Sequence, residues 1–190
     1  MSAPDWDARY RDRSVAESAP VAVLSENQHL LPQGGMALDL ASGLGANAVL
    51  LAQQGLKTFA WDSSPVAVEK LQAWSRENLL PITAEVRDVA AWPPEPERFD
   101  VIVVGHFLER PLAGALMDAL CPDGLLFYQT FTRTRVSDRG PGTDRFRLAD
   151  NELLHMFDAL RILVYREEGR VGDRARGFRD EAQLVAHKPG

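Results

Sequence analysis

The stretch that decides the fold is Leu38-Asp-Leu-Ala-Ser-Gly-Leu-Gly-Ala-Asn47, which continues the apolar run that begins at Met36. That run is typical of a buried strand, and residues 46–54 after it are predicted to form a helix. Gly43 and Gly45 allow a sharp turn between the two and let a ligand approach the backbone amides that open the helix. The stretch therefore predicts a strand, a ligand-binding turn and a helix in direct succession.

Outward from this stretch, short apolar runs alternate with amphipathic segments. The predicted strands are residues 36–41, 57–61, 82–86, 99–104 and 125–130, and predicted helices cover residues 46–54 and 108–120 and begin at Ser64-Pro65. Two further strands, residues 160–166 and 181–187, are joined by a polar loop, which favours antiparallel pairing. The pattern predicts an α/β fold: a doubly wound, Rossmann-like sheet of about seven strands, mostly parallel with an antiparallel last strand, and helices on both faces.

Residues 1–190 are predicted to form one domain, because the length is near that of one large domain. Residues 1–35 are predicted to be an N-terminal helical cap, with an amphipathic helix around residues 21–31. Residues 132–147 are irregular and rich in arginine. They are either a solvated loop or a functional segment near the active site, as a mobile lid or a cationic wall over a substrate, since long loops in compact domains are often functional.

The composition is that of an ordinary soluble protein, with 45% hydrophobic and 25% charged residues. The net charge of −6 argues against a general nucleic-acid binder, which normally has a basic face. The single cysteine, Cys121, fits a reducing compartment, and no apolar run is long enough to span a membrane. We expect a cytoplasmic protein that acts on a small molecule and has no nucleic-acid or membrane partner.

The glycine turn alone does not determine which nucleotide-type cofactor binds. Gly43-Leu-Gly-Ala-Asn-Ala48 also satisfies the dinucleotide pattern G-x-G-x-x-A. Asp39 lies inside the first strand, where its carboxylate would repel a pyrophosphate but suits a positively charged amino-acid group. The same carboxylate can also cap the following helix.

Two more aspartates follow neighbouring strands. Asp62 ends the second predicted strand, where a carboxylate can accept hydrogen bonds from both hydroxyls of a ribose. Asp88 follows the third strand and can accept from an adenine amino group, while the Val89 amide donates to the ring. Asp88 has no counterpart in the dinucleotide fingerprint, and the chain has almost no residues left for a hydride-acceptor domain. The three aspartates therefore favour a nucleoside that carries an amino-acid group.

The order of these motifs resembles that of class I S-adenosylmethionine-dependent methyltransferases over nearly the whole chain. More narrowly, it resembles the small bacterial tellurite-resistance and thiopurine-type methyltransferases. The likeness is carried by Trp6-Asp-Ala-Arg-Tyr10, Leu38–Asn47, Ala60-Trp-Asp62, Phe99-Asp100 and Leu120-Cys-Pro-Asp-Gly-Leu-Leu126. It implies S-adenosylmethionine as the cofactor, and no metal site is predicted. Ala41 departs from the pattern, because glycine is common at its position.

The resemblance implies a role in cofactor binding for twelve residues. The backbone of the glycine turn would contact the methionine part, Asp39 and the Gly105 carbonyl would lie near its amine, and Arg9 near its carboxylate. Asn47 either serves the cofactor or caps the helix. The full set is Arg9, Tyr10, Asp39, Ala41, Gly43, Gly45, Asn47, Asp62, Ser63, Asp88, Val89 and Gly105.

Methyl transfer needs a general base only if the acceptor loses a proton as it attacks. His106 follows the fourth predicted strand, at the sheet edge where such folds bind ligands, and is the candidate base; packing beside the pocket is the alternative. Arg110 and Arg147 either hold an anionic acceptor or lie on the surface.

We expect methyl transfer to a thiol, a chalcogen oxyanion or a compact metabolite. The alternatives are a non-catalytic S-adenosylmethionine-binding subunit or sensor, and a nicotinamide-dependent oxidoreductase that uses the same turn.

Overall fold

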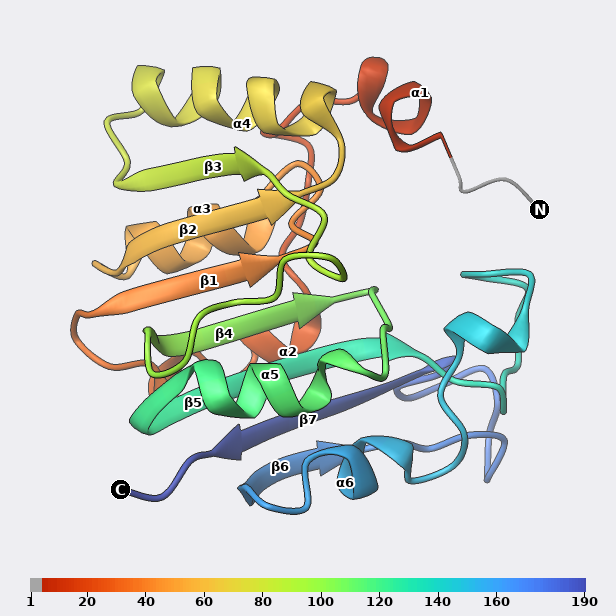
Figure 1. Ribbon diagram of the computed structural model, residues 1–190. Coiled ribbons are helices and arrows are strands. Elements are labelled where there is room, and N and C mark those ends of the chain that lie inside the picture. The colour runs from red at the N-terminus through yellow and green to blue at the C-terminus, as the bar shows by residue number, and fades with distance from the viewer. Residues whose placement is uncertain (1–4) are drawn as a thin grey trace.

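The apolar runs of the sequence form one seven-stranded sheet, with the strand order β3-β2-β1-β4-β5-β7-β6 (Figure 1). The computed structural model describes residues 5–190, so the first four residues of the predicted N-terminal cap lie outside it. The strands are β1 (Met36–Leu40), β2 (Lys57–Asp62), β3 (Ile82–Val86), β4 (Phe99–Gly105), β5 (Leu120–Phe131), β6 (Arg161–Arg166) and β7 (Glu181–His187). The helices are α1 (Trp6–Arg11), α2 (Ala22–Ser25), α3 (Ala46–Gln53), α4 (Pro65–Glu77), α5 (Leu112–Ala119) and α6 (Glu152–Met156), with short 3₁₀ turns η1 (Gln28–Leu30) and η2 (Asp144–Phe146).

Strands β1 to β5 are paired in parallel, and β7 is antiparallel to both β5 and β6. The predicted doubly wound sheet with an antiparallel last strand is therefore confirmed. The chain winds from β1 outward to β3 and then returns to place β4 on the other side of β1. Open α/β sheets bind ligands at the carboxyl ends of the strands, where the winding reverses in this way.

Alternate residues of the central strands pack on opposite faces of the sheet. Leu38 of β1 and Ile102 of β4 contribute to a core that also contains side chains of α5 and α6. Ala37 and Val101 contribute to the other core, with side chains of α2 and α3. Helices cover both faces, as Figure 1 shows, because each face of a parallel sheet is apolar and must be buried.

Three predicted boundaries were wrong. The predicted helix at residues 21–31 is divided into α2 and η1, because the Asn27 side chain donates to the Val23 carbonyl (2.9 Å) and competes with the helical bonds. Helix α5 begins at Leu112, with Pro111 as its N-terminal cap. Strand β5 begins at Leu120 rather than at residue 125, because Leu120 pairs with Phe99 of β4 through an irregular register.

Among residues 5–190, no helix has the length and apolar character needed to cross a membrane.

Candidate active site

The turn between β1 and α3 has a left-handed backbone at three positions. The φ angle is 55° at Ala41, 53° at Gly43 and 76° at Gly45. A Cβ atom on Gly45 would lie 2.3 Å from a methyl carbon of Leu71, so glycine is needed there for space as well as for conformation. Ala41, where the family pattern commonly has glycine, adopts the left-handed conformation in spite of its side chain. The turn thus keeps the sharp geometry that the sequence predicts.

The carboxylate of Asp39 lies beneath this turn and is completely buried. It accepts hydrogen bonds from Asn47 Nδ2 (3.1 Å) and from the Ala48 amide (3.0 Å). The Asn47 Oδ1 in turn accepts from the Val21 amide at 2.9 Å. Burial raises the pKa of Asp39 to about 7, although these hydrogen bonds act in the opposite direction. Asp39 therefore fastens α3 to β1, as the helix-capping alternative for this residue predicts.

Asp62 joins the end of β2 to the glycine turn. Its carboxylate accepts from the Gly43 amide (2.7 Å) and from the Ser64 amide (2.8 Å), and the residue is only 6% exposed. Burial raises the pKa of Asp62, against the lowering effect of the Ser64, Gly43 and Ser63 amides. Each carboxylate oxygen accepts one of the two backbone bonds, and a carboxylate oxygen has two acceptor sites, so hydroxyl groups of a ligand can still bind.

Helix α1 is attached to the start of α4. The Ser64 hydroxyl donates to Asp7 (2.5 Å), and Lys70 Nζ donates to the carbonyl oxygens of Tyr10 (2.9 Å), Arg11 and Arg13. These bonds bring the Tyr10 hydroxyl over the glycine turn, 2.7 Å from where a Cβ atom on Gly43 would be.

The two N-terminal residues predicted at the site differ in their surroundings. Burial and the nearby Asp62 raise the pKa of Tyr10 to about 12. Arg9 is exposed, and its guanidinium lies 5.3 Å from the centre of the Trp6 ring. Tyr10 therefore lies against the glycine turn, whereas Arg9 lies on the surface of α1.

The ends of β3 and β4 place the remaining predicted cofactor residues. Asp88 is exposed and accepts from the Ala90 amide (3.0 Å), while Val89 is buried in the core on the α5 face. Gly105 ends β4, where a Cβ atom would lie 2.8 Å from Val21 and 3.3 Å from Asn47 Nδ2. This close approach explains the glycine, and it brings the end of β4 next to the Asp39–Asn47 pair.

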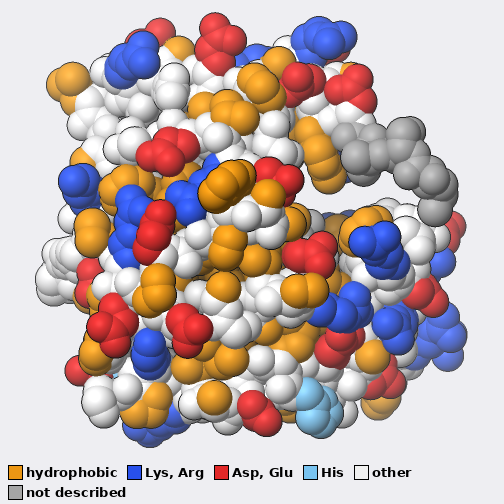
Figure 2. Space-filling model, in the orientation of Figure 1, with side chains coloured by type: hydrophobic (Ala, Val, Ile, Leu, Met, Phe, Trp, Pro, Cys, Tyr) orange, Lys and Arg blue, Asp and Glu red, His pale blue; other side chains and the backbone are white. Residues whose placement is uncertain are grey.

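These residues fit a ligand with polar groups on several sides. Within the described part of the chain, the buried Ser42 hydroxyl in the glycine turn has no hydrogen-bond partner. A buried polar group without a partner costs free energy, so a ligand that bonds to it is favoured. The described surface is also notched at this sheet edge, between α1 and the 132–147 loop (Figure 2). These polar groups fit the hydroxyls and the amine of a nucleoside with an attached amino acid.

His106 follows Gly105 and lies at the same edge. Its φ is +55°, its amide donates to the Gln129 carbonyl (2.8 Å), and its ring stacks on Phe131 with 4.9 Å between ring centres. Its Nε2 atom is 3.1 Å from Oε2 of Glu181. The left-handed backbone of a non-glycine residue is strained, and such strain is concentrated at functional sites.

Glu181 is the residue that the sequence reasoning missed. It is the first residue of β7, where antiparallel pairing places it opposite Phe131 at the end of β5. It is 4% exposed and accepts from Gln129 Nε2 (2.6 Å), while Arg139 lies 3.4 Å away. Burial alone would raise its pKa, but the bond from His106 and its charge, the bond from Gln129 and the charge of Arg139 together lower it. A carboxylate at the start of the last predicted strand was the available signal.

Arg110 and Arg147 do not have the surroundings that an anion-binding role requires. Arg147 is completely buried, and its guanidinium donates to the carbonyls of Thr132 (2.9 Å), Pro141 (2.8 Å) and Arg139. Arg110 is paired with Glu152 (2.5 Å) and with two loop carbonyls. Both guanidinium groups therefore hold the loop in place, because their donors are already used by the protein.

The 132–147 loop lies beside His106 rather than in free solvent. The Asp180 carboxylate accepts from the amides of Val136 (2.5 Å) and Ser137 (3.1 Å), which holds the beginning of the loop next to β7. Arg139 is the arginine of this loop that comes close to the His106–Glu181 pair.

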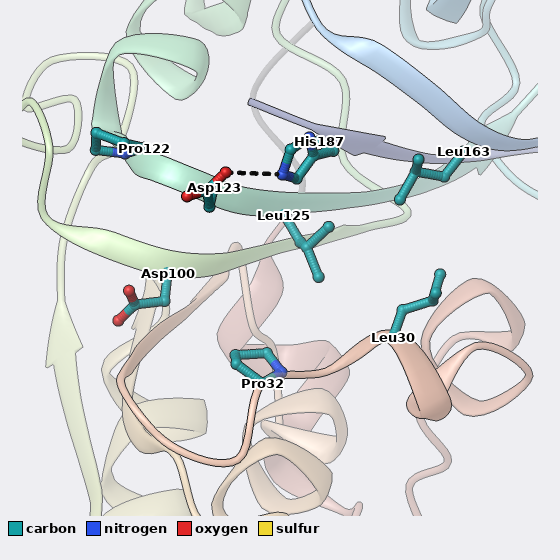
Figure 3. Close-up of a pocket in the computed structure, with 8 residues that line it drawn as sticks. All are labelled: Leu30, Pro32, Asp100, Pro122, Asp123, Leu125, Leu163 and His187. Carbon is teal, nitrogen blue, oxygen red and sulfur yellow. Dashed lines mark ion pairs between the residues drawn. The ribbon is translucent and has the colours of Figure 1, made fainter. Parts of the chain in front are cut away.

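Two hollows on the described residues lie elsewhere. One, of about 350 Å³, is at the opposite edge of the sheet, and Asp123 and His187 form an ion pair in it at 3.4 Å (Figure 3). The other, of about 320 Å³, lies beside the outer surface of α3 and is lined by Val49 and Trp74. Neither contains the glycine turn, so hollow size does not mark the candidate site. Residues 5–190 also contain no group of three or more residues that could hold a metal ion.

Known structures share this architecture. TehB from Haemophilus influenzae is 19% identical with a TM-score of 0.72, and the match covers 96% of this chain and 67% of that one. A TehB-like S-adenosylmethionine-dependent methyltransferase from Corynebacterium glutamicum is 19% identical with a TM-score of 0.65, over 97% and 96% of the two chains. An S-adenosylmethionine-dependent methyltransferase from Mesorhizobium loti is 18% identical with a TM-score of 0.69, over 92% and 100%. At these identities the likeness shows the fold, which is that of class I methyltransferases.

The family model described as "Methyltransferase domain" matches residues 37–124, which contain the glycine turn, Asp62 and His106. No curated protein sequence matches the chain. The family match over residues 37–124 and the fold together support an S-adenosylmethionine-dependent methyltransferase, with S-adenosylmethionine as the cofactor that they imply.

Proposed function

We propose that this methyltransferase acts on a small molecule, which binds beside His106 at the carboxyl edge of the sheet. The observation that carries the proposal is the arrangement of this edge. The glycine turn with its unpartnered Ser42 hydroxyl lies next to Gly105, and His106 follows directly. A donor bound on the turn and an acceptor beside His106 would therefore be neighbours. The acceptor is a thiol, a chalcogen oxyanion or a compact metabolite.

S-adenosylmethionine supplies an already activated methyl group, so the protein chiefly has to position donor and acceptor and to exclude water. Asp62 and Ser63 would bind the ribose, and Asp88 with the Val89 amide the adenine. The backbone of Ala41, Gly43 and Gly45 would hold the methionine part.

The other groups of the edge would complete the site. The Gly105 carbonyl and the Asp39–Asn47 pair would lie near the methionine amine. Tyr10 already covers the glycine turn, which supports a role for α1 in closing the site over the cofactor. Arg9 would have to leave the Trp6 ring to reach the methionine carboxylate.

His106 is the candidate general base, because a buried carboxylate partner gives it more than a packing role. This pair favours an enzyme over a non-catalytic sensor. The narrower likeness to tellurite-resistance enzymes rests on sequence motifs and supports a chalcogen acceptor. The negative net charge and the single cysteine support a cytoplasmic protein that needs no nucleic acid or membrane for its reaction.

The test is calorimetric titration with S-adenosylmethionine, S-adenosylhomocysteine and NAD. We expect the first two to bind and NAD not to bind. Binding of NAD alone would overturn the assignment and favour a nicotinamide-dependent oxidoreductase.

The same titration tests the ribose site through Asp62→Ala. We expect this variant to bind S-adenosylmethionine at least tenfold more weakly, because it lacks a carboxylate that would accept hydrogen bonds from the ribose. Asp100→Ala is the matched control. Asp100 accepts a hydrogen bond from the Met36 amide at 2.7 Å, the same length as the bond from Gly43 to Asp62, but it lies at the other edge of the sheet. The control should lose stability but keep its affinity. Equal affinities of the two variants would contradict the ribose assignment.

A further inference from the structure

The starting observation is a buried carboxylate that the fold itself does not require. Glu181 is 4% exposed and is the first residue of β7, a strand whose backbone is already paired with β5 and β6. Burying a charged group is costly unless it is paired and hydrogen-bonded. Here three groups from three different segments supply the pairing: His106 after β4, Gln129 of β5 and Arg139 of the loop.

Gln129 fixes the orientation of the Glu181 carboxylate. Gln129 Oε1 accepts from the Val23 amide (2.7 Å), so its amide nitrogen must face Glu181, to which it donates at 2.6 Å. Both Gln129 and Glu181 are almost completely buried. The Glu181 oxygen that faces His106 is therefore fixed by a chain of bonds that begins at the backbone of α2.

The direction of the His106 bond follows from the charge of Glu181. Glu181 accepts from Gln129 Nε2 and lies 3.4 Å from the Arg139 guanidinium, which favours its ionised form, and an ionised carboxylate only accepts hydrogen bonds. The 3.1 Å contact therefore requires a proton on His106 Nε2. In the neutral ring the lone pair is then on Nδ1, which has no hydrogen-bond partner among residues 5–190.

We infer that Glu181 is a positioning residue that holds His106 as the Nε2–H tautomer, with Nδ1 as the base, and that the methyl acceptor is a hydroxyl or thiol that must lose a proton. This inference rests on the proposed function and narrows its acceptor class. An oxyanion without a proton to lose would need no such pair.

The step is balanced with the groups named. The acceptor oxygen or sulfur attacks the methyl carbon while its proton passes to Nδ1 of His106. The electron pair of the broken sulfur–methyl bond stays on the departing sulfur. The products are the methylated acceptor, S-adenosylhomocysteine and an imidazolium ion that is stabilised by Glu181.

The first experiment measures the tautomer directly. ¹⁵N-labelled protein with S-adenosylhomocysteine bound is studied by long-range nitrogen–proton NMR at a pH where the ring is neutral. We expect His106 to be protonated on Nε2 in the wild type, and Glu181→Gln to give a mixture or the Nδ1–H form. Asp123→Asn is the control, because Asp123 pairs with His187 at the opposite edge, so only the His187 signals should change (Figure 3).

The second experiment measures methyl transfer to three probes. 2-Phenylethanethiol and 2-phenylethanol keep their protons at neutral pH, and they distinguish a thiol from a hydroxyl acceptor; 4-nitrobenzenethiol is already ionised. We expect Glu181→Gln to lower kcat about a hundredfold or more with the protic probe that the wild type uses, and much less with 4-nitrobenzenethiol.

The outcomes separate the two proposals. An Nδ1–H ring in the wild type, or equal loss of kcat with ionised and protic thiols, would overturn the role of Glu181. Methylation of selenite that is unaffected by Glu181→Gln would overturn the acceptor class. Failure of the wild type to bind S-adenosylhomocysteine would instead contradict the proposed function, and the calorimetric titration detects this before either experiment.

Discussion

Replacing Gly45 by alanine tests the glycine turn, which the rest of the site depends on. Two costs add at this position. The left-handed φ of 76° costs an ordinary residue about 1–2 kcal/mol. The new Cβ would also lie 2.3 Å and 2.7 Å from the two methyl carbons of Leu71, a completely buried side chain. Such overpacking typically costs about 1–3 kcal/mol. We therefore expect Gly45→Ala to lower the free energy of unfolding by about 2–5 kcal/mol.

Gly114→Ala is the matched control for this prediction. Gly114 lies inside α5, and a Cβ atom there would meet nothing within 4 Å. Alanine is a better helix former than glycine, so this variant should be more stable than the wild type by about 0.5–1 kcal/mol. Urea unfolding followed by circular dichroism gives both values from the midpoint and slope. If Gly45→Ala were as stable as the wild type, the turn would not have the strained, crowded geometry described above.

Two further predictions concern buried charges. Because the folded protein keeps a proton on Asp39 up to a pH of about 7 and the unfolded chain loses it near pH 4, this group lowers the free energy of unfolding by about 1.4 kcal/mol per pH unit across that range. Asp39→Asn should remove this dependence of the free energy of unfolding on pH. In urea titrations, the variant should therefore compare more favourably with the wild type at pH 8 than at pH 4. An unchanged pH dependence would mean that Asp39 is ionised in the folded protein. Arg147→Lys should cost about 1–3 kcal/mol and expose the 132–147 loop to limited proteolysis, since lysine cannot reach three carbonyls as the planar guanidinium does. The exposed Arg133→Lys is its control, and equal cleavage of both variants would contradict the structural role of Arg147.

The carboxyl edge of the sheet combines two kinds of side chain. Asp39 and Asp62 both bond to backbone amides of the glycine turn or of the helix that follows it, so they hold the geometry of the candidate site. His106 and Glu181 bond to each other and to Gln129, and they leave the turn unaffected. Substitutions of the first pair are therefore expected to change stability together with cofactor binding. Substitutions of the second pair should change chemistry while leaving the glycine turn and cofactor binding intact.

The sequence by itself determined the local parts of this protein. The strand, the glycine turn and the helix of residues 36–54 are contiguous, and their apolar periodicity and glycines are enough to specify them. The alternation of such units predicted a doubly wound, mostly parallel sheet, because a helical crossover makes neighbouring strands parallel. The positions of Asp62, Asp88 and His106 at strand ends followed from the same pattern.

The tertiary structure alone decided which distant residues meet. Glu181 is 75 positions from His106, and the two are neighbours only because β7 enters the sheet antiparallel to β5 and starts at its carboxyl edge. Arg147 and Arg139 belong to one arginine-rich segment, yet one is completely buried and the other is exposed beside Glu181. Periodicity describes a residue's own element, whereas burial and pairing depend on the elements packed against it. For that reason the sequence predicted the glycine turn, whereas only the fold decided the surroundings of His106.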